Sequence, residues 1–157
     1  MKRNHLQTVG ILFVVALMFG ITGCREGKYT GGGTIASTVA GKANFGFVID
    51  TCNPITNLGW GVFTFNDKGA KVKFQAKGDV LGIGGFNGVM SYYILDYRST
   101  DPKQMGEGTV WVGGDDQGEG RELHGKISIY VMDGPYGGYN NSGDVSGNIV
   151  EHECDPI

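Results

Sequence analysis

The chain has 157 residues, a formal net charge of −3 and 29 glycines. The mild acidity argues against nucleic acid or anionic lipid as the main partner, because both are bound through a basic face. The glycines follow no three-residue period, which excludes a collagen-like rod. They stand beside aromatic and β-branched residues, which indicates many short strands joined by tight turns.

Residues 1–24 have the layout of a secretory signal, with Lys2 and Arg3 followed by an apolar run at 9–21. This run of 13 residues is too short for a spanning helix, which needs roughly 20. The closing residues Ile21-Thr22-Gly23-Cys24 resemble the lipobox of bacterial lipoproteins. The resemblance implies a lipid thioether on Cys24, cleavage before it and acylation, as with palmitate, of the new amino terminus. A plain secretory signal with Cys24 as a disulfide partner is the alternative.

Cleavage before Cys24 would leave 134 of the 157 residues and lower the net charge from −3 to −5. Residues 24–28 are then a short tether and 29–157 a single glycine-rich domain. The predicted location is the bacterial cell envelope, with the domain held outside the cytoplasm by the lipid anchor. Arg25 follows the cysteine where an inner-membrane retention signal has Asp, which favours the outer membrane in a bacterium with two membranes.

Beyond the signal, short stretches alternate between apolar and polar residues. The clearest is 41–50, where Ala43, Phe45, Phe47 and Ile49 share one face. The three glycines at 31–33 indicate either a linker or a strand on which another backbone packs closely. Further strands are predicted at 60–65, 70–77, 86–97, 108–112, 121–133 and 146–152, with turns or loops at 66–69, 98–104, 113–120 and 134–143.

These short connections predict an all-β, antiparallel up-and-down meander of about eight strands. Closure into a barrel, with the first and last strands paired, removes the exposed edges of such a meander. A two-sheet β-sandwich is the alternative.

Four segments carry a family resemblance: TGGGTI at 30–35, GKANFGF at 41–47, the strand at 127–133 and GNIVEH at 147–152. They resemble a β-rich module of bacterial secreted proteins that is sometimes called the post-COAP domain. The resemblance implies a secreted β domain and brings no established activity.

Cys52 and Cys154 remain once Cys24 is lipidated, and an even pair in an exported chain predicts a disulfide. In the meander the second and eighth strands flank the first and run in the same direction, so both cysteines emerge at one end. Two free thiols, or a metal pair with His152, are the alternatives.

The sequence contains no recognisable catalytic constellation, and no cofactor is predicted. Asp115, Asp116 and Glu119 place acidic oxygens in a glycine loop, but without the spacing of a calcium-binding loop. A solvated turn is the preferred interpretation and a metal site the lesser one. An enzyme that uses Asp50, His124 or this loop is the least favoured function.

Tyr136 and Tyr139 lie in a predicted loop and are the preferred aromatic contacts for a protein or glycan partner. Core packing is the alternative for these rings. The predicted function is therefore a non-catalytic envelope lipoprotein whose β domain has a binding or structural role. A carrier of one small ligand inside the barrel is the second hypothesis.

Overall fold

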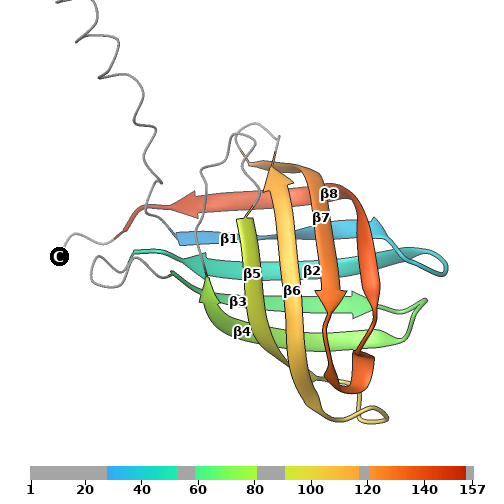
Figure 1. Cartoon of the computed structure of the whole chain (residues 1–157). Coiled ribbons are helices and arrows are strands. Elements are labelled where there is room, and N and C mark those ends of the chain that lie inside the picture. The colour runs from blue at the N-terminus through green and yellow to red at the C-terminus, as the bar shows by residue number, and fades with distance from the viewer. Residues whose placement is uncertain (1–27, 53–58, 81–90, 117–120, 155–157) are drawn as a thin grey trace, which may run out of the picture.

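The computed structural model describes residues 28–52, 59–80, 91–116 and 121–154, so the signal, Cys24 and the tether up to residue 27 lie outside the described residues. The fold is a closed antiparallel barrel in which every strand pairs with its neighbours in sequence and β1 pairs with β8 (Figure 1). This confirms the predicted all-β barrel over the sandwich. The strands are β1 Lys28–Ala36, β2 Lys42–Asp50, β3 Gly59–Asp67, β4 Val72–Val80, β5 Ser91–Ser99, β6 Glu107–Asp116, β7 Glu122–Val131 and β8 Asn140–His152, with a 3-10 turn η1 at Gly134–Tyr136.

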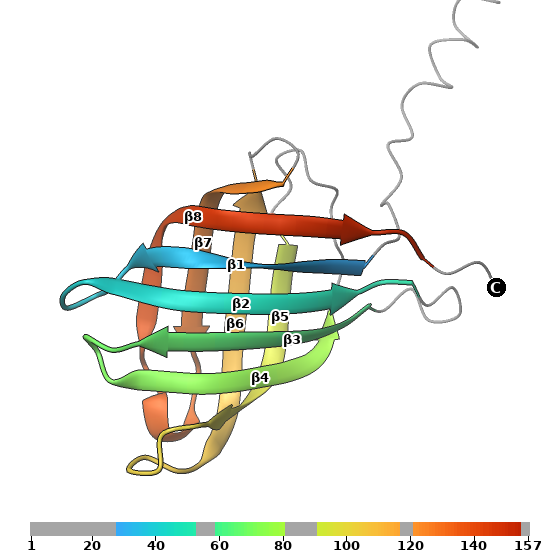
Figure 2. The same cartoon turned by 180° about the vertical axis from the view of Figure 1, so that it is seen from behind.

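The strands fall into two groups that cross steeply. Figures 1 and 2 show β1 to β4 running along one side and β5 to β7 across the other, while β8 bends from one direction to the other. Within the described part of the chain, no helix has the length and hydropathy of a membrane span.

Alternation fills the barrel with aromatic side chains. Phe45, Phe63, Phe65 and Phe74 point inward from β2, β3 and β4 and are at most 7% exposed. The ring centroids of Phe65 and Phe74 lie 5.5 Å apart, and those of Phe74 and Tyr97 lie 5.1 Å apart. Large side chains thus occupy this part of the interior, which counts against a small-ligand cavity there.

The triple glycine is part of β1, and two other backbones pack against it. A Cβ added at Gly32 would lie 2.6 Å from the Phe45 carbonyl oxygen, and one at Gly33 would lie 2.6 Å from the Ser146 carbonyl oxygen. One at Gly147 would collide with the backbone of Gly32. Glycine here allows β2 and β8 to approach β1 closely, so the segment is a strand and not a linker.

The two ends of the barrel differ. At the end that we call the amino-terminal end, Lys28 pairs with both Asp50 and His152. Two residues farther along, Cys52 and Cys154 are joined by a disulfide with a Cα–Cα distance of 5.4 Å. The opposite end, which we call the closed end, is covered by η1.

Several predicted boundaries are wrong. The strand β8 begins at Asn140, so residues 140–143 are not a loop, and β6 continues to Asp116 through residues predicted as a loop. The hairpin turn falls at 68–71, where Lys71 has a φ of 59°, and not at 66–69. The predicted strand start at 86–90 lies outside the described residues, and β5 continues to Ser99.

Candidate functional site

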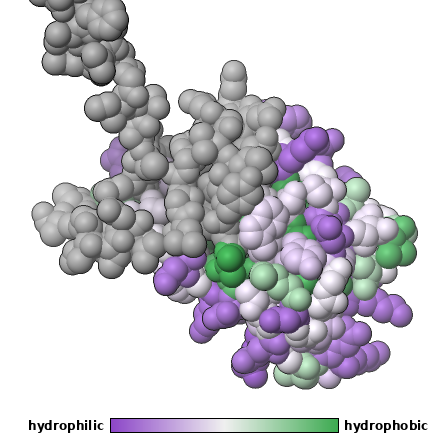
Figure 3. Space-filling view, viewed as in Figure 1, coloured by the Kyte–Doolittle hydropathy of each residue, from purple (hydrophilic) through white to green (hydrophobic). Residues whose placement is uncertain are grey.

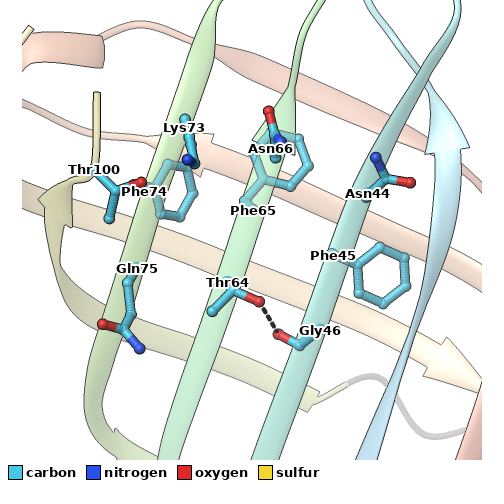
Figure 4. Close-up of a pocket in the computed structure, with 10 residues that line it drawn as sticks. All are labelled: Asn44, Phe45, Gly46, Thr64, Phe65, Asn66, Lys73, Phe74, Gln75 and Thr100. Carbon is cyan, nitrogen blue, oxygen red and sulfur yellow. Dashed lines mark hydrogen bonds between the residues drawn. The ribbon is translucent and has the colours of Figure 1, made fainter. Parts of the chain in front are cut away.

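A depression of about 490 Å³ lies on the outside of β2, β3 and β4, near the closed end (Figure 4). Its lining residues come from these three strands and from the residue that follows β5. They are Asn44, Phe45, Gly46, Thr64, Phe65, Asn66, Lys73, Phe74, Gln75 and Thr100.

The strand register arranges the outward side chains in two rows. Asn44 pairs with Asn66, and Asn66 pairs with Lys73, so these three form one row across the sheet. In Figure 4 this row lies above a second row, formed by Gly46, Thr64 and Gln75, which are paired in the same way. Neighbouring strands are about 4.8 Å apart and alternate residues about 6.8 Å, so the two rows span roughly 10 by 7 Å.

The depression has its low point at a glycine. Gly46 is the one member of the two rows without a side chain, and its carbonyl oxygen accepts a hydrogen bond of 3.2 Å from Thr64 Oγ1. A Cβ at Gly46 would lie 3.2 Å from that hydroxyl oxygen, so a small side chain is sterically tolerable but would narrow the depression. The neighbouring Phe45 is 7% exposed, which leaves backbone and not an aromatic ring at the surface.

The two rows contain side-chain amides that form no hydrogen bond within the described part of the chain. The side-chain amides of Asn44, Asn66 and Gln75 form no hydrogen bond with another described residue. Each amide both donates and accepts hydrogen bonds. The rows are therefore available to a ligand that also carries donors and acceptors close together.

The charge at the depression is positive. Lys73 contributes an ammonium group to the lining, and the lining contains no carboxylate. Arg98 lies opposite Gln75 on β5, and its Nε is 3.9 Å from Glu107 Oε1, with both side chains highly exposed. An exposed pair at this distance contributes little, so the guanidinium remains available as a cation.

Of the two predicted contact residues, Tyr136 is buried, so the prediction is wrong for it, and Tyr139 is half-buried against the core. The turn η1 folds under the barrel and buries Tyr136, whose side chain is 6% exposed. Its hydroxyl lies 2.8 Å from Ser99 Oγ and donates to the Lys73 carbonyl oxygen at 3.1 Å. Tyr139 packs against the core, and its ring centroid is 5.8 Å from that of Phe65.

Exposed aromatic and apolar side chains lie instead on strands. Trp60 is 49% exposed on β3 and Tyr130 is 44% exposed on β7. In the register of β5, β6 and β7, Ile94 and Tyr130 lie on either side of Trp111. These three strands face the viewer in Figure 3, which also shows hydrophilic side chains at the closed end. Among the described residues, the exposed rings therefore lie on the outward positions of strands and not in the predicted loop.

A buried carboxylate joins the closed end to the core. Asp67 Oδ1 accepts hydrogen bonds from Ser37 Oγ at 2.7 Å and from the Ala70 N–H at 3.0 Å, and Oδ2 accepts one from the Tyr139 hydroxyl at 2.8 Å. Burial raises the pKa of Asp67, but these hydrogen bonds outweigh it and hold the pKa below its ordinary value of 3.8. Burial, and then the bond to Asp67, raise the pKa of Tyr139. This cluster is structural and faces the barrel interior.

The other predicted sites can be placed in part. The side chains of Asp115, Asp116 and Glu119 lie outside the described residues, and the described residues contain no group of three side chains that could hold a metal ion. Cys52 is joined to Cys154, and His152 Nε2 lies 3.1 Å from Thr30 Oγ1. Asp50 accepts a hydrogen bond from the Cys52 N–H, so it supports the chain next to the disulfide.

Comparisons of the chain with protein-family models, with curated proteins and with solved structures find no match. The function must therefore be argued from the chemistry of the molecule. Within the described residues, the depression on β2 to β4 combines a surface recess, unused hydrogen-bonding groups and local charge in one place.

Proposed function

We propose that this protein is a lipid-anchored, non-catalytic binding domain of the bacterial cell envelope, akin to the post-COAP module, and that it binds a saccharide in the depression on β2 to β4. The observation that carries the proposal is the pair of rows that places the amides of Asn44, Asn66 and Gln75 on one face of the sheet together with Gly46, which has no side chain. The groups at this site are suited to holding a ligand.

The lining residues support binding better than turnover. General acid–base catalysis needs a titratable group within reach of the reacting proton, and nucleophilic catalysis needs a nucleophile beside a base. The lining offers amides, two threonine hydroxyls and one lysine, without a carboxylate or histidine. Such groups bind by hydrogen bonding and charge.

A saccharide fits these groups better than a peptide does. A sugar hydroxyl both donates and accepts, and so does a side-chain amide, which allows paired hydrogen bonds with neighbouring hydroxyls. An extended peptide is commonly bound by pairing with a free sheet edge. Along the depression the strands are already paired: β2 lies between β1 and β3, β3 lies between β2 and β4, and the part of β4 that lines the site, Phe74 and Gln75, pairs with β3 and β5.

The proposed anchor would leave the depression accessible. Cys24 precedes Lys28 by four residues, which span at most about 14 Å. Asn44 pairs with Thr34, six residues farther along β1 than Lys28, a distance of about 20 Å along the strand. A lipid on Cys24 would thus hold the amino-terminal end at the membrane and direct the closed end, with the depression, away from it.

Lipidation is tested by labelling. In a bacterial host grown with radioactive palmitate, we expect the wild-type chain to become labelled and the Cys24→Ser variant to lose the label completely, since the thiol that accepts the lipid is absent. The matched control is Cys52→Ser, which removes a different thiol and should remain labelled. A Cys24→Ser chain that keeps its label would contradict the proposed anchor.

Binding is tested at the low point of the depression. We expect Gly46→Val, in the detergent-solubilised full chain, to weaken binding of its best saccharide on a glycan array at least about tenfold, because the added side chain fills the recess. Ser146→Val adds the same side chain at an exposed position on β8 and is the control. Binding by Gly46→Val at the wild-type level, with an unchanged melting temperature, would contradict the site, as would the absence of any bound saccharide.

A further inference from the structure

We infer that the saccharide bound at this depression is acidic and that Lys73 recognises its carboxylate or phosphate group. This inference rests on the proposed function, because it assigns the chemistry of the ligand to the same site. Three observations support it: the positive charge at the two rows, the hydrogen bonds that fix the backbone of Lys73, and the absence of carboxylates and exposed aromatic rings from the lining.

The outward face of β4 carries Lys73 and Lys77 and, farther from the depression, one carboxylate, Asp79, in a chain whose net charge is −3. Lys73 and Lys77 are both exposed on this face, and Gln75 stands between them. Arg98 lies opposite Gln75 on β5, while Asp96 lies opposite Lys77, outside the lining. The lining itself therefore carries positive charge without a carboxylate, and Asp96 lies opposite Lys77 and not opposite Lys73 in the strand register.

Lys73 is held in place by its backbone. Its carbonyl oxygen accepts two hydrogen bonds, one of 3.1 Å from the buried Tyr136 hydroxyl and one of 3.0 Å from the Thr100 N–H. These bonds join the start of β4 to η1 and to the loop after β5. The ammonium group consequently extends from a fixed position at the end of the row that contains Asn66 and Asn44 (Figure 4).

Lysine is a compact charge with three donors, which suits either a carboxylate or a phosphate oxygen. Single-stranded nucleic acid also carries phosphates, but proteins bind it by stacking its bases on exposed aromatic rings. The aromatic residues of this lining are Phe45, Phe65 and Phe74, whose exposed fractions are 7%, 2% and 2%. The lack of an exposed ring in this lining disfavours single-stranded nucleic acid, and its amides, hydroxyls and one lysine favour an acidic saccharide.

The test uses two ligand pairs in which one member carries acidic groups that the other lacks, with the detergent-solubilised full chain and calorimetric titration. The first pair is tetragalacturonate and its fully methyl-esterified form. The second pair is pentamannose with and without a 6-phosphate. We expect at least one acidic member to bind about tenfold more tightly than its neutral partner, as for a hydrogen bond to a charged group. The pair that shows the difference identifies carboxylate or phosphate as the recognised group.

Variants then assign the preference to one side chain. We expect Lys73→Gln to reduce the acidic preference to within about twofold while the affinity for the neutral partner is kept. Lys77→Gln removes a lysine from the same strand but outside the lining and should keep the preference. Equal binding of acidic and neutral partners by the wild type, or a preference that persists in Lys73→Gln, would overturn the inference and leave the proposed saccharide site standing. Binding of none of the four would also overturn the inference, whereas the proposed function is contradicted only if the glycan array shows no bound saccharide.

Discussion

Replacement of Asp67 by alanine is expected to lower the free energy of unfolding by about 3 kcal/mol near neutral pH. Asp67 is completely buried at the end of β3, and its carboxylate accepts from Ser37, Ala70 and Tyr139. Each of these donors would lose its partner, and a buried unsatisfied donor costs about 1–3 kcal/mol, offset in part by water that enters the space. Urea unfolding followed by tryptophan fluorescence measures the difference.

The control for this variant is Asp101→Ala, because Asp101 Oδ1 accepts the Lys103 N–H in an exposed turn. Water can replace the carboxylate there, so we expect a loss below about 1 kcal/mol, as for an exposed side-chain hydrogen bond. Equal losses for the two variants would show that burial of the Asp67 cluster contributes nothing to stability.

The penalty of Asp67→Ala should also depend on pH. The pKa of Asp67 is lower in the folded chain than its ordinary value of 3.8. The ionised carboxylate therefore contributes its full stabilisation above pH 3.8, and this contribution disappears as the pH falls through the folded pKa. The difference between wild type and variant should shrink correspondingly below pH 3.8. If the stability difference between wild type and Asp67→Ala stayed constant until Asp67 is fully protonated, the ionised carboxylate would have no stabilising role.

The barrel was predictable because its determinants are local. Alternation at 41–50 specifies which side chains of β2 enter the core, and short connections specify antiparallel neighbours. The start of β8 was not predictable, because Asn141 is of a residue type that is common in loops. Its buried side chain donates to the Ala36 carbonyl oxygen at 3.0 Å, which satisfies a polar group inside the barrel and lets the strand begin early.

The candidate site was harder to predict because it depends on register. Asn44, Asn66 and Lys73 belong to three strands, and each alone has the pattern of an ordinary solvated position. The turn between β3 and β4 could have predicted part of the site, because a turn at 68–71 puts Asn66 opposite Lys73. The sequence prediction placed this turn two residues too early, and it also preferred Tyr136 because a glycine-rich segment is usually exposed.

Removal of the disulfide is expected to have the other large effect. Cys52 and Cys154 are 102 residues apart, and a cross-link over such a loop restricts the unfolded chain strongly. The entropy model gives up to about 4.7 kcal/mol, and measured values are usually about 2–4 kcal/mol. We therefore expect the Cys52→Ser, Cys154→Ser double variant to lose about 2–4 kcal/mol in urea unfolding, and the wild type to lose a similar amount after reduction.

The disulfide lies far from the depression, so its removal should lower stability without weakening saccharide binding. Cys52 follows β2 and Cys154 follows β8 at the amino-terminal end, whereas Asn44 and Gly46 lie toward the closed end. The double variant should therefore still bind the saccharide with wild-type affinity at temperatures where it is folded, because the register of β2, β3 and β4 is set by their own pairing. Gly46→Val should show the opposite behaviour, with normal stability and weakened binding. A folded double variant with weakened binding would mean that the depression depends on the amino-terminal end of the barrel, contrary to a site formed by three strands.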